Sequence, residues 1–394
     1  MRVSTMGQFQ QALNQMLRLQ TETARTQLQV GSGQRHLSAA DDPAAVAGAT
    51  RLDTTLAGMA QFAENANLAR QRLQMEESAL NDVADVLQRL RELAVRGSND
   101  TLADDDRAAV AAEVRSLQDQ LLGLANSADG RGRYLFAGSA DAAAPFAKTP
   151  GGGVTYFGDD LARQVPIDAA RTVADGDTGS NVFLRVPAGN GTFSVAMQTA
   201  NTGGGYLRNA KMADAAAYDG GDYTIGFSGG GYTVTDSAGA TIASGTYTAD
   251  QPISFRGLSL TFNGSPDDGD AFNLTASRSA SLFSMAGDLA EALSTGTPDA
   301  ARRTAMVGSL SDLDGALNHI QNLRTGVGVR LQALDRSDAA REGMALELEA
   351  SLSDLRDVDI AEAATRLSIQ STALQAAQNA FVRVQGLSLF NFLR

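Results

Sequence analysis

The stretch GSGQRHLSAADDPAAVAGATRL, residues 31–52, gathers residue types that could form a ligand site. His36, Asp41 and Asp42 could converge there on a metal ion or a phosphate. The chain has only 2 histidines, and His319 lies in a different zone of the sequence. Neither histidine has a second His or Cys at ligand spacing, and a zinc site needs three or four converging ligands. We therefore predict no metal site at this stretch.

The segment DGDTGSN is the strongest candidate for calcium. Asp175 and Asp177 have the spacing of a calcium-binding loop. Gly179 occupies the third ligand position, however, and Val186 the twelfth, where a glutamate is needed. The acidic segment PDDGD, from Pro266, could hold a hard cation weakly, but Pro-Asp-Asp-Gly is itself a turn signal.

Motifs for catalysis or nucleotide binding are missing from the sequence. A phosphate-binding P-loop needs Gly-Lys-Ser/Thr, whereas Lys148 and Lys211 each follow an alanine. The three Gly-Gly-Gly runs lack the strand-to-helix context of a dinucleotide site. We predict no catalytic residue, no metal and no cofactor, so the function lies in the surfaces of the protein.

Composition narrows the possible partners. A net charge of −13 over 394 residues argues against nucleic acid and anionic membranes, which both attract basic patches. The absence of cysteine excludes disulfides, thiolate catalysis and zinc–cysteine sites. The N-terminus has no cleavable secretory signal, and no run of about 20 apolar residues could span a membrane.

The changes in composition and apolar periodicity along the sequence predict an α+β fold. Residues 1–137 and those after about 280 have helical patterns, whereas 138–279 are rich in Gly, Asp, Thr and alternating apolar residues typical of antiparallel strands. We predict a long-helix coiled-coil bundle built from both chain ends, with an inserted antiparallel β-rich domain. Within the insert, VTYFGDDLARQVPI reads as a strand pair. The predicted domains are a terminal coiled coil (1–42 and 360–394), a helical bundle (43–137 and 280–359) and a β-rich outer domain (138–279).

The terminal helices carry narrow apolar stripes. A helix from Thr5 to about Val30 has apolar residues at near-heptad spacing, and the last segment, from Ile360, ends in a dense apolar run. A stripe this narrow cannot be buried within one helix, so each helix needs a partner. The predicted assembly interface comprises Met6, Phe9, Leu13, Leu17, Leu28, Leu367, Leu374, Phe381, Val384, Leu387 and Phe390.

The opening stretch then reads as a joint between helices. Gly31 and Gly33 can end the first helix by adopting a positive φ. Asp42 is predicted to cap the long second helix, with Pro43 as its first residue and Asp41 adding negative charge at the positive end of the helix dipole. Farther along, Thr101 followed by Asp104 resembles a capping box and predicts the start of a third helix.

Both chain ends resemble the flagellin superfamily. SGQRHLSAADDPAAVAGATRL is similar to the segment after the first helix of flagellins, with Ser38 opening the Ser-Ala-x-Asp-Asp motif. DIAEAATRLSIQSTALQAAQNAFVRVQGLSLFNFL is similar to the flagellin-type C-terminus. The segment GRGRYLFAGS at 130–139 and the GLSLTFNGSPDDGDAFNL end of the insert are closer to the hook-associated branch of the superfamily than to flagellin.

The resemblance implies a structural subunit of the bacterial flagellum, at the junction between hook and filament. It implies as partners the protein itself in a ring, hook-associated protein 1, flagellin, and an export chaperone on the C-terminal helix. It further implies export out of the cell without cleavage of a signal peptide. A flagellin-like filament subunit is the alternative. A third hypothesis, from another class, is an enzyme or carbohydrate-binding protein whose β domain holds a ligand.

Overall fold

The computed structural model describes residues 5–99, 101–294 and 296–390, and among these the side chains of Gly7, 9–99, 101–294 and 296–383. The chain divides into two compact units, which we describe separately. Unit 1 comprises Met1–Glu64 and Arg336–Arg394, and unit 2 comprises Asn65–Asp335. Helical ends flank an antiparallel β-rich middle, which confirms the predicted fold class.

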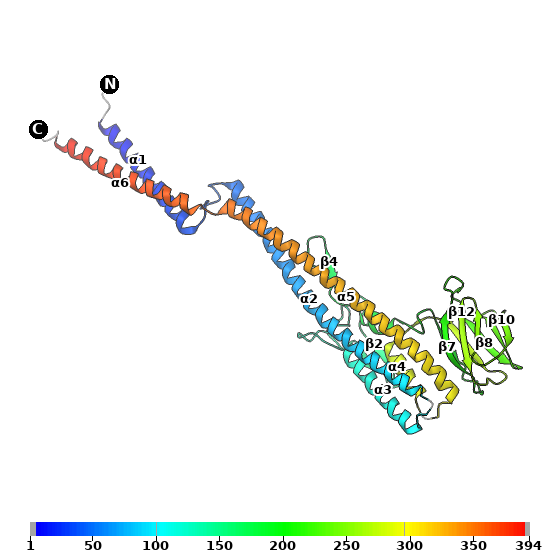
Figure 1. Ribbon diagram of the computed structural model, residues 1–394. Helices are drawn as coiled ribbons and strands as arrows, with labels where there is room; N and C mark the ends of the chain where they lie inside the picture. The colour runs from blue at the N-terminus through cyan, green and yellow to red at the C-terminus, as the bar shows by residue number, and fades with distance from the viewer. Residues whose placement is uncertain (1–4, 100, 295, 391–394) are drawn as a thin grey trace. The chain divides into compact units, whose positions relative to one another are not determined.

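Six α-helices account for both ends of the described chain (Figure 1). They are α1 (Thr5–Ser32), α2 (Pro43–Gly97), α3 (Asp104–Ala125), α4 (Leu282–Ala292), α5 (Asp299–Arg356) and α6 (Ile360–Phe390). The predicted third helix is present as α3, but its predicted cap is wrong, and the helix begins two residues later than a Thr101 cap implies. Ala103 is the N-cap residue and makes no side-chain bond, while the Thr101 hydroxyl donates to the Asn99 side chain. Three aspartates in the first turn of α3 supply the negative charge there instead.

Short antiparallel strands make up the middle of the chain. Five of them form a sheet in the order β10-β9-β8-β13-β6, three form a sheet in the order β11-β12-β7, and the pairs β1-β2, β3-β4 and β14-β5 stand apart. The strands are β1 (Phe146–Lys148), β2 (Val154–Tyr156), β3 (Gln164–Pro166), β4 (Thr172–Ala174), β5 (Val186–Pro187), β6 (Phe193–Met197), β7 (Tyr206–Met212), β8 (Tyr223–Ser228), β9 (Gly231–Asp236), β10 (Thr241–Thr246), β11 (Pro252–Phe255), β12 (Leu258–Asn263), β13 (Ala271–Ala276) and β14 (Ser279–Ala280), with a short π-helix, η1 (Ser180–Leu184), before β5.

The predicted pairing within VTYFGDDLARQVPI is wrong. Its first strand, β2, pairs backwards with β1, and its second, β3, pairs forwards with β4. Each strand therefore closes a local hairpin with its nearest neighbour outside the segment. Between them, residues 157–163 form a loop in which Asp159 Oδ1 accepts from Leu161 N at 3.0 Å, within the loop, and from Ser139 N at 2.8 Å, outside it.

Unit 2 contains two hydrophobic cores. The first is formed by α2, α3, α4 and α5 together with side chains between Leu135 and Val186, including the stacked rings of Phe183 and Phe283. The second lies among the strands of the two larger sheets, with Phe227, Phe262 and Phe272 in mutual ring contact. The residues of the second core begin at Phe193, whereas the β-rich domain predicted from the sequence begins at residue 138. The predicted domain boundaries remain predictions.

Unit 1 contributes no described residue to either core. It consists of α1, α6 and the adjoining segments of α2 and α5, and Leu352 and Ala363 are its buried apolar side chains. Among the described residues, no helix is long and apolar enough to cross a membrane. Unit 1 is therefore a set of amphipathic helices with very little apolar interior.

Candidate assembly surface

Helices α1 and α6 lie side by side in unit 1 (Figure 1). The rings of Phe9 and Phe381 contact each other with centroids 5.1 Å apart. Farther along, the Thr26 hydroxyl donates to Gln370 Oε1 at 2.8 Å. The covered stripe of α1 comprises Leu13, Met16, Leu19, Thr23 and Thr26, and that of α6 comprises Ala363, Leu367, Gln370, Leu374 and Phe381. Threonine and glutamine in these stripes leave the pair with few apolar contacts.

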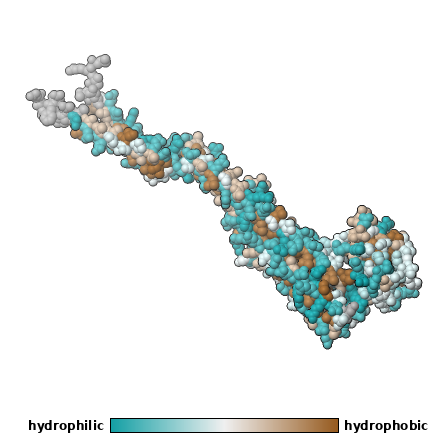
Figure 2. Space-filling view, in the orientation of Figure 1, coloured by the Kyte–Doolittle hydropathy of each residue, from teal (hydrophilic) through white to brown (hydrophobic). Residues whose placement is uncertain are grey.

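Large apolar side chains remain exposed on unit 1. Eight of the 13 exposed large apolar side chains of the described chain belong to it, although it is much the smaller unit. They are Phe9, Leu17, Leu28, Met344, Leu346, Ile360, Ile369 and Val382. Figure 2 shows such hydrophobic residues in brown among hydrophilic teal on the helices next to the grey ends. Such a surface is typical of a protein that binds another protein.

The predicted interface residues whose side chains are described fall into two sets, with Phe9 between them: it is 37% exposed, yet its ring contacts Phe381. Leu13, Leu367, Leu374 and Phe381 belong to the covered stripes of α1 and α6. Leu17 and Leu28 are instead 50% and 63% exposed, because the covered stripe runs through Met16, Thr23 and Thr26. The side chains of Met6, Val384, Leu387 and Phe390 lie outside the described residues. Which of these residues touch another subunit stays a prediction.

The joint between α1 and α2 is closed by a backbone pairing. Gly33 has a φ of 72°, and its N–H donates to Gln29 O at 2.9 Å, which ends α1. Gly31, which we expected to share this role, lies inside α1, since only Gly33 has the left-handed conformation. The chain after α1 then pairs with the chain before α6: Arg35 N donates to Arg356 O at 2.7 Å, and Val358 N donates to Gly33 O at 2.9 Å.

The side chain of Asp42 caps the start of α2. Asp42 Oδ1 accepts hydrogen bonds from the N–H groups of Ala45 and Ala44, at 3.0 and 3.1 Å, directly before Pro43. These bonds, led by that of Ala45, hold the pKa of Asp42 below its ordinary value. The residue that the sequence predicts as the N-cap of α2, Asp42, is therefore the residue that makes the capping hydrogen bonds.

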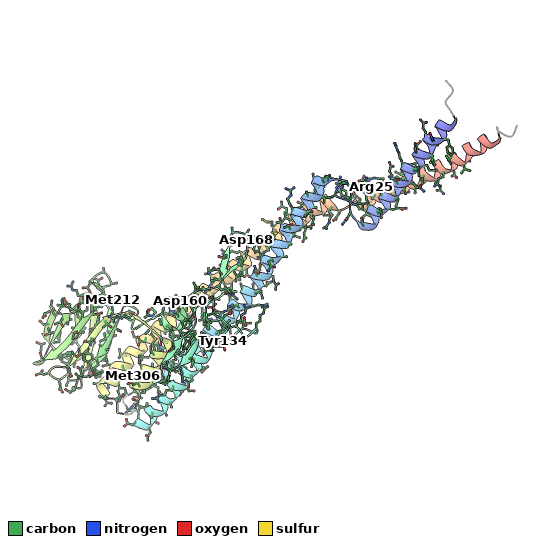
Figure 3. All side chains as sticks on the ribbon, turned by 180° about the vertical axis from the view of Figure 1, so that it is seen from behind. Arg25, Tyr134, Asp160, Asp168, Met212 and Met306 are labelled. Carbon is green, nitrogen blue, oxygen red and sulfur yellow. The ribbon has the colours of Figure 1, made fainter. Side chains whose placement is uncertain are left out.

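Asp41 connects the joint to α1. Its carboxylate accepts from Leu37 N at 3.0 Å and from Ser38 N at 3.2 Å, and it pairs with Arg25 at 2.8 Å (Arg25 is labelled in Figure 3). Partial desolvation opposes ionisation, but the hydrogen bonds from Ser38 and Leu37 and the charge of Arg25 outweigh it and keep the pKa of Asp41 low. The sequence assigned Asp41 only to the helix dipole and missed this ion pair.

His36 lines an open, polar groove of about 850 Å³ in unit 1. Its walls carry both signs of charge, including Glu22, Arg25, Asp354 and Arg366. Within the described residues, no group of three or more His, Cys, Asp or Glu side chains is arranged to hold a metal ion. The groove is thus a charged surface hollow without the geometry of a metal centre.

The calcium-like segment of unit 2 forms ion pairs. Asp175 is buried, and its Oδ2 accepts from Arg163 Nε at 2.8 Å. The carboxylate of Asp177 pairs with Arg330 of α5. The acidic turn near Pro266 is likewise internal: buried Asp270 accepts from the N–H groups of Thr202 and Asp267, each at 2.9 Å. These carboxylates satisfy partners within the chain.

A buried polar network in unit 2 was not visible in the sequence. Arg72 of α2 donates through Nη2 to Tyr134 O at 2.8 Å and to Leu135 O at 3.1 Å (Tyr134 is labelled in Figure 3). One turn later, Glu76 Oε1 accepts from Asp177 N at 2.9 Å. Burial, and next the nearby Asp177 carboxylate, raise the pKa of Glu76 to about 8. A charged pair four residues apart on a helix normally predicts a solvated face, so no sequence signal marks this network.

Comparison with known proteins identifies both ends of the chain. The bacterial flagellin N-terminal helical region matches residues 3–141, and the bacterial flagellin C-terminal helical region matches residues 310–393. The middle, residues 196–276, matches the D2-like domain of flagellar hook-associated protein 1. The fold therefore belongs to the class of flagellin-like proteins with an inserted β domain.

Three relatives match nearly their whole length. Flagellar hook-associated protein 3 of Escherichia coli K12 is 29% identical over 395 residues, covering 99% of both chains. The crystal structure of Xanthomonas campestris FlgL is 35% identical with a TM-score of 0.71, covering 77% of this chain and 99% of that one. The flagellar junction protein FlgL of Legionella pneumophila is 27% identical with a TM-score of 0.71, covering 79% of this chain and 100% of that one. The chain belongs to the flagellar hook-associated protein 3 family.

Proposed function

We propose that this protein is the structural subunit that joins the flagellar hook to the filament, through coiled-coil self-association of its terminal helices. Membership of the hook-associated protein 3 family supports the location, and the Legionella relative is titled a flagellar junction protein. One observation carries the mechanism: unit 1 has no described residue in a hydrophobic core, yet it exposes eight large apolar side chains. Burial of that surface against other subunits would stabilise it.

The physical basis is the marginal stability of α1 and α6 alone. An isolated helix pair with threonine and glutamine in its seam gains little free energy from burial, so its ordering depends on neighbours. Packing of Leu17, Leu28, Ile369 and Val382 against the same helices of adjacent copies would supply the missing apolar contacts. We propose that these contacts close into a ring-like homo-oligomer.

We extend the proposal to the partners and the route of the protein. In the flagellum the ring contacts hook-associated protein 1 on one side and flagellin on the other. Before export, a chaperone covers the apolar C-terminal helix α6 in the cytoplasm. The chain then leaves the cell unfolded, without cleavage of a signal peptide. Membership of the flagellar hook-associated protein 3 family supports the flagellar location on which these steps depend.

A flagellin-like filament subunit is the second candidate, because the helical regions matched at both ends are those of flagellin itself. The test is assembly of the purified protein on isolated hooks. A junction subunit adds a bounded layer, whereas a filament subunit grows indefinitely. In cells, deletion of the gene should leave hooks without filaments and release flagellin into the medium, and the wild-type gene should restore filaments. Indefinite growth of the purified protein would refute the junction proposal.

A second measurement addresses the mechanism. Limited proteolysis of the monomer should trim roughly the first and last ~40 residues quickly, since weakly packed termini are preferred sites of cleavage. The same peptide bonds should resist the protease once the protein is assembled. Termini that resist the protease in the monomer would contradict ordering on assembly, while leaving the location in the flagellum untouched.

A further inference from the structure

The buried network around Arg72 contains polar atoms that the protein itself does not satisfy. Arg72 is 6% exposed and Glu76 is 1% exposed. Arg72 Nε and Glu76 Oε2 are both buried and have no hydrogen-bond partner in the described chain. Arg72 Nε lies 3.9 Å from Asp175 Oδ2, which is too long for a hydrogen bond. A buried polar atom without a hydrogen-bond partner costs free energy, so these two atoms require a ligand.

Arg72 Nε and Glu76 Oε2 both lie near one point beside Gly176. A methyl group on Gly176 would lie 3.6 Å from Arg72 Nε, 3.6 Å from Leu135 O and 3.7 Å from Glu76 Oε2. A cavity of about 10 Å³, counted as space open to the centre of a water molecule, is lined by Arg72, Leu135, Asp175 and Gly176 but not by Glu76, whose Oε2 approaches the Gly176 position. A single water needs about this volume and two to four polar partners.

We propose that a single buried water molecule binds beside Gly176 and bridges Arg72 Nε, Glu76 Oε2 and Leu135 O. The donors and acceptors decide the class of ligand. A cation would face the Arg72 guanidinium, and an anion would face the carboxylate of Asp175 and the carbonyl of Leu135. Water both donates and accepts, so it bonds to Arg72 as an acceptor and to Leu135 O as a donor.

The bridge completes a network that spans four parts of unit 2. Arg72 and Glu76 belong to α2, Leu135 to the segment before β1, and Gly176 to the segment before η1, which Asp177 links to Arg330 of α5. The water therefore has a structural role: it adds a bridge between two loops and α2, beside the direct hydrogen bonds from Arg72 to Leu135 O and from Asp177 N to Glu76 Oε1.

The direction in which Gly176→Ala changes the melting temperature tests the proposal. Gly176 does not have a positive φ, and its methyl group would meet only ordinary van der Waals distances, so Gly176→Ala is sterically tolerated. In a dry cavity, alanine would raise the melting temperature of the full chain by restricting the unfolded state. If water is bound, the methyl group displaces it, and the melting temperature falls. The matched control is Gly130→Ala, where a methyl group meets nothing within 4 Å and φ is not positive.

The water itself is observable in a high-resolution crystal structure of the protein. We expect one density peak within about 2.7–3.2 Å of Arg72 Nε and Glu76 Oε2. An anomalous peak at this point after a bromide soak would identify an anion and overturn the proposal. No peak, or an unchanged or raised melting temperature for Gly176→Ala, would overturn it as well.

Discussion

The raised pKa of Glu76 predicts that this protein loses stability as the pH rises through neutrality. The ordinary pKa of 4.5 applies to the unfolded chain, whereas burial beside Asp177 raises the pKa of folded Glu76 to about 8. Between these values the folded state holds a proton that the unfolded state has released. The free energy of unfolding therefore falls with increasing pH across this window. The contribution of Glu76 is fully present below pH 4.5 and is lost as the pH rises through about 8.

The magnitude follows from the linkage relation. Each pH unit within the window changes the free energy of unfolding by up to about 1.4 kcal/mol for one proton. From pH 5 to pH 7 the contribution of Glu76 is thus at most about 3 kcal/mol. Aspartates whose pKa is lowered, such as Asp42 and Asp129, lose their stabilising charge only under more acidic conditions and do not contribute here.

Glu76→Gln isolates this effect. Glutamine keeps an oxygen that can accept the hydrogen bond from Asp177 N, but it cannot ionise. We expect the denaturant midpoint of the variant to fall less than that of the wild type between pH 5 and pH 8, and the variant to exceed the wild type in stability at pH 8. The assay is denaturant unfolding followed by circular dichroism at constant ionic strength. Groups with raised pKa elsewhere, Asp288 and Asp312, are present in both proteins and cancel in the comparison.

The control for this experiment is Glu92→Gln, on the same helix but with a largely exposed side chain. It should keep the pH dependence of the wild type, because an exposed carboxylate is solvated in both states. The reasoning fails if Glu76→Gln retains the wild-type slope between pH 5 and pH 8. It also fails if the variant is destabilised equally at every pH, since that would mean that Glu76 acts only through its shape.

Three further predictions concern the network, the helix pair and the joint. Arg72→Met removes two buried donors and an ion-pair partner, and should lower the free energy of unfolding by about 3–5 kcal/mol in denaturant titrations; a change below 1 kcal/mol would contradict this role. Phe381→Ala removes the ring contact with Phe9 and should abolish addition to isolated hooks without changing thermal unfolding of residues 65–335; normal addition would exclude the contact from assembly. Asp42→Ala leaves two N–H groups of α2 without their acceptor, so limited proteolysis should cut the joint faster, and an unchanged rate would contradict the cap.

Local sequence signals predicted the features that depend on neighbouring residues. The cap at Asp42 and Pro43 needs only residues within three positions, and the helix end at Gly33 needs a residue that tolerates positive φ. The order of helical and β-rich zones followed from the periodicity of apolar residues. The resemblance of both chain ends to flagellins supplied the family, and the comparisons confirm it.

Features that depend on distant residues were not predictable. Glu76, Asp177 and Arg330 are separated by 101 and 153 positions, and no local pattern relates them. The seam of α1 was also ambiguous, because apolar residues lie on two faces of that helix. The stripe predicted from the sequence runs through Leu17 and Leu28, because it follows hydrophobicity alone. The covered stripe in the structure includes Thr23 and Thr26, whose hydroxyl groups donate to backbone carbonyls of the same helix.

These long-range contacts bear on the export of the unfolded chain that we propose above. The Phe9–Phe381 contact closes unit 1, and the Asp177–Arg330 ion pair ties a loop of unit 2 to α5. Each contact joins segments from distant parts of the chain. Forming it has an entropic cost of loop closure, and the contact can offset that cost only when both segments are free to meet. A chain held partly inside an export channel lacks one of the two segments, whichever end leaves first. The topology therefore opposes folding before export is complete, as the proposed function requires.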